Sequence, residues 1–256
     1  MYSLDTTKLG FSLANARALA LASRLAYTEL PTVTGRGTDT QVLITELDNA
    51  IVIAFRGTTN LRDFVTDAQA WRENLADCQI HCGFLAAWKS VMDGIAAQLV
   101  TLPPKPLFIT GHSLGGALAV LCANVLAGRV HSVYTFGQPR VGNADFANRS
   151  RALLSGRHFR IVNANDIVPR LPGALIGYRH SGEQIFLDAL GRLEQNAALW
   201  LMAVSDAFGL WEEWNKSKRI ALLADHHIDR YITALSESSS SSSSSSSSLT
   251  LNPKLK

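Results

Sequence analysis

The chain has 256 residues, a length that suits one domain with a sizeable hydrophobic core. Its composition, 47% hydrophobic and 18% charged, excludes a chain that is disordered throughout. A net charge of +3, without a basic block, gives no indication of a nucleic-acid partner. Polar residues interrupt every long apolar stretch, so we expect no transmembrane segment.

The first ten residues are polar and do not resemble a secretory signal. We therefore expect a cytoplasmic protein or the mature form of a secreted one. Of the three cysteines, Cys122 lies on the apolar face of a predicted helix and should be a buried thiol. Reduced thiols are the expectation throughout, and a Cys78–Cys82 disulfide is the alternative. The sequence shows no zinc-binding pattern, and we expect neither a metal nor a cofactor.

Strands alternate with helices along most of the chain. Two strands on either side of the Asp48–Asn49 turn should form an antiparallel hairpin at one edge of a sheet. The later alternation predicts an α/β fold with a mostly parallel central sheet and helices on both faces. We expect helices at 11–27, 84–100, 114–126, 144–154 and 228–235, and strands at 41–47, 50–55, 106–110, 132–136, 158–163 and 184–187.

The C-terminal end has a different composition from the rest of the chain. Residues 238–248 are all serine, and a serine run buries no apolar surface. We therefore predict a single domain over residues 1–236. Residues 237–256 should form a serine-rich tail outside it, either flexible or artefactual.

Residues 111–116 read Gly-His-Ser-Leu-Gly-Gly and contain the pattern G-x-S-x-G. An apolar strand leads into this motif and an apolar helix leads out of it, the setting of a nucleophile elbow. The chain turns so sharply at Ser113 that side chains at Gly111 and Gly115 would clash. The turn should present the Ser113 hydroxyl at the carboxyl end of the sheet. An ordinary glycine-rich turn is the alternative.

A serine nucleophile needs a base and a carboxylate that orients the base. In this fold class the carboxylate follows the serine and the histidine follows the carboxylate. Asp166 lies in a loop just after a strand, and Pro169 and Pro172 should hold that loop in place. Asp188 is the second choice, and an ordinary Asx-turn role for Asp166 is the alternative.

His180, His226 and His227 lie late enough in the chain to serve as the base. His226 comes directly before the final predicted helix, where it can face a cleft. His227 is adjacent and should point elsewhere, and His180 is expected in a solvent-exposed loop. We favour His226, and a surface helix-cap role is the alternative for it.

Acyl transfer also needs N–H donors where the carbonyl oxygen becomes negative. The backbone N–H of Leu114 follows the nucleophile directly. A second donor is expected from the loop after the strand at 50–55, where Thr58 offers both a backbone N–H and a hydroxyl.

Together, these residues resemble the class 3 lipases, the family of the fungal triacylglycerol lipases. The resemblance extends in pieces from Gln41 to Tyr231. It rests on Phe-Arg-Gly-Thr at 55–58, His-Cys-Gly-Phe at 81–84 with Ala87 and Trp88, the elbow at 111–116, Thr-Phe-Gly-Gln-Pro-Arg-Val-Gly-Asn at 135–143, Asn-Asp-Ile-Val-Pro-Arg-Leu-Pro at 165–172, and Asp225-His226 with Tyr231.

The resemblance implies an α/β-hydrolase fold with a Ser113–Asp166–His226 triad and an oxyanion hole from Thr58 and Leu114. It implies cofactor-free hydrolysis of ester bonds in acylglycerols or related lipids, with contact to a lipid–water interface as a further expectation. The position of Tyr231 favours His226 over His227. The fungal enzymes are secreted and disulfide-bonded, and this sequence shows neither sign.

Two segments are candidates for a lid over the cleft. Residues 59–75 occupy the place of the family's lid, but they are mostly polar. Residues 196–214 carry Trp200, Leu201, Val204, Phe208 and Trp211 at helical spacing and could line an acyl pocket. A core helix packed on the sheet is the alternative for the second segment.

Two other activities fit the same scaffold, a phospholipase A1 and a feruloyl-type esterase, because specificity depends on the acyl and head-group pockets. From another class, a non-catalytic lipid-binding protein is the alternative. The complete set of Ser113, Asp166 and His226 argues against it, since a binding module needs no triad. The sequence leaves the oligomeric state open.

Overall fold

The central element is an eight-stranded sheet in a computed structural model that describes residues 3–58, 72–75, 77–163, 166–188, 192–195 and 226–241. The strands of the described part lie in the order β1-β2-β3-β6-β7-β8-β9-β10. Their bounds are β1 Val33–Thr34, β2 Gln41–Glu46, β3 Ile51–Phe55, β6 Leu107–His112, β7 Val130–Phe136, β8 His158–Asn163, β9 Glu183–Leu187 and β10 Leu193–Gln195. A separate ribbon pairs β4 (Arg72–Leu75) with β5 (Cys78–His81).

Five neighbouring strands, β3, β6, β7, β8 and β9, run parallel to one another. The outer strands β1, β2 and β10 pair antiparallel. The predicted hairpin of two early strands is therefore confirmed as β2–β3, with the two-residue β1 outside it. Because parallel strands share one direction, the chain segments that leave their carboxyl ends meet at one edge of the sheet.

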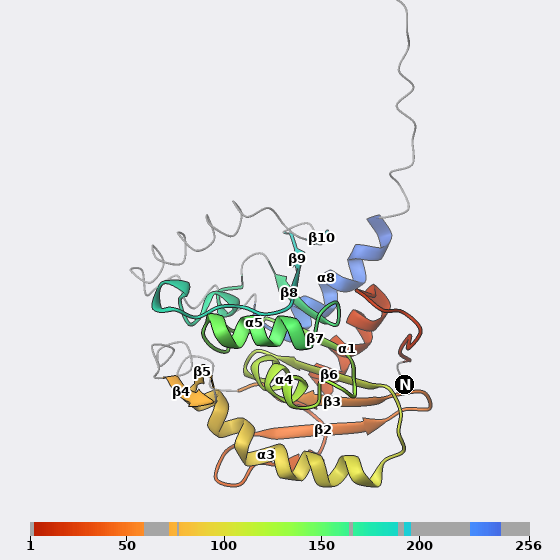
Figure 1. Ribbon diagram of the computed structural model, residues 1–256. Coiled ribbons are helices and arrows are strands. Elements are labelled where there is room, and N and C mark those ends of the chain that lie inside the picture. The colour runs from red at the N-terminus through yellow and green to blue at the C-terminus, as the bar shows by residue number, and fades with distance from the viewer. Residues whose placement is uncertain are drawn as a thin grey trace, which may run out of the picture.

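Helices cover both faces of this sheet, as the sequence predicts (Figure 1). On one face lie α3 (Cys82–Thr101), α4 (Leu114–Val125) and α5 (Ala144–Leu153), which share a hydrophobic cluster with β3 and β6. On the other face lie α1 (Leu13–Leu25) and α8 (Ile228–Ser241). Every residue of β3 and β6 is buried, which explains the continuous apolar sequence of β3 and of the first half of β6.

The helix α8 extends beyond the predicted domain boundary at residue 236 and ends at Ser241. The hydroxyls of Ser236 and Ser238 donate to the carbonyls of Ile232 and Ala234, each at 2.8 Å, one helical turn back. The Arg17 guanidinium of α1 binds the Leu235 carbonyl at 2.8 and 2.9 Å. The first serines of the run are therefore part of the helix, which is longer than the helix predicted at 228–235.

The cysteines carry free thiols, as expected, and the alternative Cys78–Cys82 disulfide is not formed. Cys122 is buried in α4, and this burial raises the pKa of its thiol. Within the described ranges, no helix has the length and hydrophobicity needed to cross a membrane.

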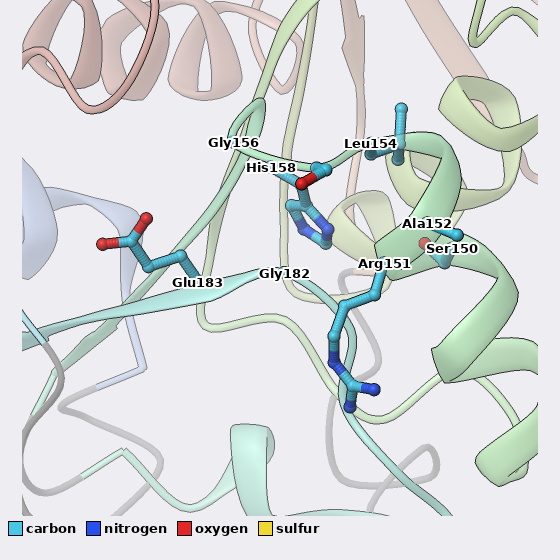
Figure 2. A pocket seen from close by; sticks show the side chains of 9 residues that line it. Ser150, Arg151, Ala152, Leu154, Gly156, His158, Gly182 and Glu183 are labelled. Carbon is cyan, nitrogen blue, oxygen red and sulfur yellow. The ribbon is translucent and has the colours of Figure 1, made fainter.

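A cavity of about 460 Å³ lies at the amino ends of β8 and β9. The His158 imidazole points into it, between the end of α5 and Gly182 (Figure 2). Both ring nitrogens of His158 are buried without a hydrogen-bond partner in the described structure. Burial, with a smaller contribution from the nearby Arg160, lowers the pKa of His158 to about 3.

Acid should destabilise this fold. The unfolded chain protonates its histidines near their ordinary pKa of 6.5, whereas burial keeps His158 neutral down to about 3 and His81 down to about 4. Because the unfolded state binds more protons in this range, the free energy of unfolding should fall as pH decreases below 6.5. Each such histidine contributes a slope of about 1.4 kcal/mol per pH unit.

Urea unfolding of the His158→Gln variant between about pH 6 and pH 4 tests this, since the slope should decrease by about one proton. Ser155→Ala removes a non-titrating residue that lines the same cavity and should leave the slope unchanged. An unaltered slope in His158→Gln would contradict the assignment.

Candidate active site

The site is built around Ser113, which joins β6 to α4. Its backbone lies in the left-handed region, with φ 59° and ψ −130°, and it is the one such non-glycine residue among the described residues. This strained conformation is typical of a nucleophile elbow. A Cβ on Gly111 would overlap the backbone of Gly115, which confirms the predicted crowding across the turn. A Cβ on Gly115 would overlap the Phe55 carbonyl at the end of β3.

The loop that follows β3 lies directly beside the elbow. A Cβ on Gly57 would come within 3.2 Å of the Ser113 Cβ and 2.7 Å of the His112 carbonyl oxygen. Thr58 is the next residue and therefore follows the point of closest approach. On the other side of the serine, Leu114 is the first residue of α4, where backbone N–H groups have no partner within the helix. Leu114 thus directly follows Ser113, and Thr58 directly follows the glycine that lies beside the elbow.

Asp166 and His226 are in direct contact, although 60 residues separate them. The His226 Nδ1 lies 2.7 Å from the Asp166 Oδ2. The Tyr231 hydroxyl donates to the same oxygen at 2.5 Å, and the Val168 N–H donates to Oδ1 at 2.9 Å. The carboxylate is thereby fixed from the loop after β8 and from α8, and it holds the imidazole by its Nδ1 edge.

The contact between the serine and the histidine is not formed. Ser113 Oγ and His226 Nε2 are both buried, and neither has a hydrogen-bond partner in the described structure. Ser113 is 1% exposed, Asp166 1% and His226 2%, so water does not readily solvate them. Of the expected series of two hydrogen bonds, the structure therefore contains the one between His226 and Asp166. Catalytic hydrogen bonds of unliganded enzymes are often long and shorten in the substrate complex.

Two contacts nevertheless place His226 next to the elbow. The His112 Nε2 lies 2.5 Å from the His226 carbonyl oxygen, and the two imidazole rings are 4.4 Å apart between centroids. His112 directly precedes Ser113 in the chain. The Ser113 N–H in turn donates to the Phe136 carbonyl, just before Gly137.

Gly137 closes the site from the end of β7. Its φ of +58° lies in the left-handed region. A Cβ at this position would lie 2.7 Å from Asp166 Oδ2 and 2.7 Å from His226 Cε1. The position therefore requires glycine for two reasons, backbone conformation and space.

The alternative residues are engaged elsewhere. Asp188 accepts from the Arg192 backbone N–H and from its guanidinium, each at 2.8 Å. His227 is exposed at the start of α8. His180 lies in a loop as expected and is partly buried, with its Nε2 2.6 Å from the Pro169 carbonyl and its Nδ1 buried.

Three residues of the site were not predicted as part of it: His112, Gly137, and Tyr27, whose hydroxyl lies 2.9 Å from His112 Nδ1. His112 precedes the serine and so falls outside the expected chain order of a triad base. Gly137 directly follows the strand predicted at 132–136, and this position at a strand end could have indicated that it borders the site. Tyr27 shows no pattern in the sequence that would connect it to the elbow.

Both candidate lid segments extend outside the described residues. Of residues 59–75 only 72–75 are described, and 196–214 lie entirely outside. In the part of the chain that is described, no group of three or more His, Cys, Asp and Glu side chains could hold a metal ion.

The strained serine elbow at the carboxyl edge of a mostly parallel sheet, together with the buried Asp166–His226 pair, defines an α/β-hydrolase fold. The sequence profile of the family described as "Lipase (class 3)" matches residues 52–176. This match, together with the similar fungal lipases, supports a place for the chain among the class 3 lipases.

Known proteins resemble the chain over about three-fifths of its length. The secreted mono- and diacylglycerol lipase 1 of Fusarium solani is 39% identical over 171 residues, which cover 62% of this chain and 51% of that protein. The solved triacylglyceride lipase of Rhizomucor miehei matches with a TM-score of 0.55 at 32% identity, covering 60% of this chain and 64% of that one.

A third match is a triacylglycerol lipase structure whose catalytic centre is described as a serine protease triad. Its TM-score is 0.54 at 32% identity, again covering 60% of this chain and 64% of that one. The chain spans about half the length of the curated relatives that it matches.

Gly137→Ala should disrupt the Asp166–His226 pair. The new methyl group would displace the carboxylate or the imidazole, and a displacement of about 1 Å in such a pair can cost about 100-fold in rate. Gly156→Ala is the matched control, because Gly156 has a similar φ of +66° but no atom within 4 Å of the added Cβ. Hydrolysis of a soluble p-nitrophenyl ester measures both variants. Equal rates in the two would show that the clash is unimportant.

Proposed function

We propose that the protein is a serine hydrolase that cleaves carboxylic ester bonds of acylglycerols or related lipid esters through an acyl-enzyme on Ser113. The observation that carries this proposal is the buried pair of Asp166 and His226 beside a strained serine elbow. A buried hydroxyl and a buried imidazole nitrogen without partners are costly to maintain, and such groups are typical of a reaction centre.

In the first half-reaction, His226 Nε2 takes the proton from Ser113 Oγ as that oxygen attacks the ester carbonyl. The C–O bond of the tetrahedral intermediate then breaks, and the alcohol leaves with the proton carried by His226. In the second half-reaction, His226 takes a proton from the water that attacks the acyl-enzyme. The bond between the acyl carbon and Ser113 Oγ then breaks, His226 returns the proton to Oγ, and the fatty acid leaves. Asp166 holds the imidazole with its proton on Nδ1 and stabilises the charged form.

Thr58 and Leu114 stabilise the oxyanion in both half-reactions. The Leu114 N–H is oriented by the first turn of α4, and the positive end of the helix dipole adds to its effect. Thr58 reaches the same point from the end of β3, because Gly57 allows that strand to approach the serine. Loss of one donor of this kind costs about 10²–10³ in rate.

The substrate class rests on the relatives and on the surface near Asp166. The matched Fusarium solani protein is a mono- and diacylglycerol lipase, and the matched solved structures are triacylglycerol lipases. In the short helix η2 (Ala174–Ile176), in the loop region that follows Asp166, Leu175 and Ile176 are 81% and 48% exposed. Exposed apolar side chains there support contact with a lipid–water interface.

Covalent labelling with a fluorophosphonate tests the nucleophile. We expect the folded protein to gain one label, and peptide mass spectrometry should place it on Ser113. Ser113→Ala should lose both the label and ester hydrolysis, whereas Ser155→Ala, an exposed serine at the opposite end of the sheet, should retain both. Folded protein without a label would favour the alternative of a non-catalytic lipid-binding protein.

A substrate panel distinguishes the lipase from its two rivals. Emulsified triacylglycerol, diacylglycerol, a phospholipid and a feruloyl ester should be compared at equal enzyme concentration. We expect acylglycerols to be hydrolysed fastest. Faster release of the sn-1 fatty acid from the phospholipid would indicate a phospholipase A1, and faster cleavage of the feruloyl ester would indicate a feruloyl esterase.

A further inference from the structure

Tyr27 and His112 form a polar connection between the two sides of the site. Tyr27 lies just after α1, and its hydroxyl is 2.9 Å from His112 Nδ1. His112 is the last residue of β6, and its Nε2 is 2.5 Å from the His226 carbonyl oxygen. The Gly57 backbone N–H donates to the Tyr27 hydroxyl from the loop that carries Thr58. The connection therefore extends from the oxyanion loop to the main chain of the base.

The protons along this connection can be assigned from chemistry. A carbonyl oxygen only accepts, so His112 Nε2 must carry the proton. Burial is the main reason that the pKa of His112 lies well below its ordinary value, so the ring is neutral and Nδ1 has no proton. Nδ1 must then accept from the Tyr27 hydroxyl, whose oxygen accepts from Gly57. All three hydrogen bonds therefore run in one direction: Gly57 donates to Tyr27, Tyr27 donates to His112, and His112 donates to the His226 carbonyl.

The His226 carbonyl is available for this contact because α8 does not use it. The Arg230 N–H, which would be its partner one helical turn later, donates instead to the His227 carbonyl at 2.9 Å. The side chain of His226 is held by Asp166, and its main chain is held by His112. Two independent hydrogen bonds thus fix the orientation of the imidazole.

From this geometry we infer that Tyr27 and His112 are positioning residues, which set the main chain of His226 and that of the oxyanion loop relative to Ser113. This inference rests on the proposed function. Neither side chain takes up or releases a proton in the reaction. The His226 carbonyl selects the His112 tautomer with a proton on Nε2, and Tyr27 stabilises this tautomer by donating to Nδ1. In the other tautomer, two acceptors would face each other across 2.5 Å.

Tyr27→Phe tests the role of the hydroxyl. The variant leaves His112 Nδ1 and the Gly57 N–H without their partner, so the His112 ring and the oxyanion loop are held less firmly. We expect kcat for a soluble ester to fall about ten-fold while KM changes less than two-fold, since positioning acts in the transition state. Tyr134→Phe is the matched control: it removes another buried hydroxyl that accepts a backbone N–H, from Ser12 at 2.9 Å. It should lose similar stability with kcat unchanged.

Substitutions at His112 test the donor itself. His112→Leu removes the N–H to His226 and should lower kcat about 100-fold. His112→Gln restores an N–H donor at nearly the same reach and should recover most of that loss, although it cannot accept from Tyr27 in the same way. If His112 only filled space, the His112→Gln variant would not have a higher kcat than the His112→Leu variant.

The imidazole ¹⁵N–¹H spectrum gives a readout that is independent of catalysis. In the wild type the His112 ring should show a proton on Nε2 alone, and in Tyr27→Phe the Nδ1 resonance should shift because this nitrogen loses its hydrogen bond. A proton on Nδ1 in the wild type would overturn the inference. So would a kcat of Tyr27→Phe equal to that of Tyr134→Phe, or equal rates for the two His112 variants. Failure of Ser113 to take the fluorophosphonate label would instead overturn the proposed function, and the spectrum would still test the positioning.

Discussion

The contact between His226 Nδ1 and Asp166 Oδ2 is the constraint on which the candidate site depends. It connects a loop at the carboxyl end of β8 to the start of α8 across 2.7 Å. Three donors converge on this carboxylate, from His226, Tyr231 and Val168. Charge-assisted hydrogen bonds of this kind are short and specific in direction, so they define where the imidazole can lie. Because β6 and β8 run parallel, the serine elbow after β6 and the Asp166 loop after β8 lie at the same edge of the sheet.

Glycines make this convergence sterically possible. Gly111 and Gly115 allow the elbow to fold tightly, Gly57 admits the end of β3, and Gly137 leaves space for both the carboxylate and the imidazole. At each of these positions a methyl group would come closer than van der Waals contact allows to backbone or to a functional side chain. The dense packing of the site is thus encoded by residues that contribute no side chain at all.

Much of the fold could be predicted from the sequence, because long buried strands and apolar helices carry strong periodicity. The parallel core, the β2–β3 hairpin and the helices on both faces follow from residues such as those of β3 and β6. The short strands β1, β4, β5 and β10 could not be predicted, since two to four residues are too few to show alternation. The end of α8 was also missed, because the hydroxyl-to-carbonyl bonds of Ser236 and Ser238 depend on a helix that already exists.

The choice of site residues depended on signals of different strength. The elbow at Ser113 has a motif with a physical reason for each glycine. His226 could be separated from His227 by its place before a helix and by Tyr231. The contribution of His112 could not be predicted, because its contact with His226 joins residues 114 positions apart through a main-chain carbonyl. Every residue has a main-chain carbonyl, so the order of side-chain types does not indicate which carbonyl a histidine will bind.

The attachment of α8 to α1 has a consequence for the order in which the molecule matures. As the chain leaves the ribosome, the sheet, the serine and the aspartate emerge before the helix that carries the histidine. Before α8 docks, its Leu235 carbonyl is not yet bound by Arg17, and Tyr231 does not yet contact Asp166. At this stage the proposed nucleophile lacks its proposed base. Under the proposed function, a chain interrupted before α8 would therefore lack its base and be inert.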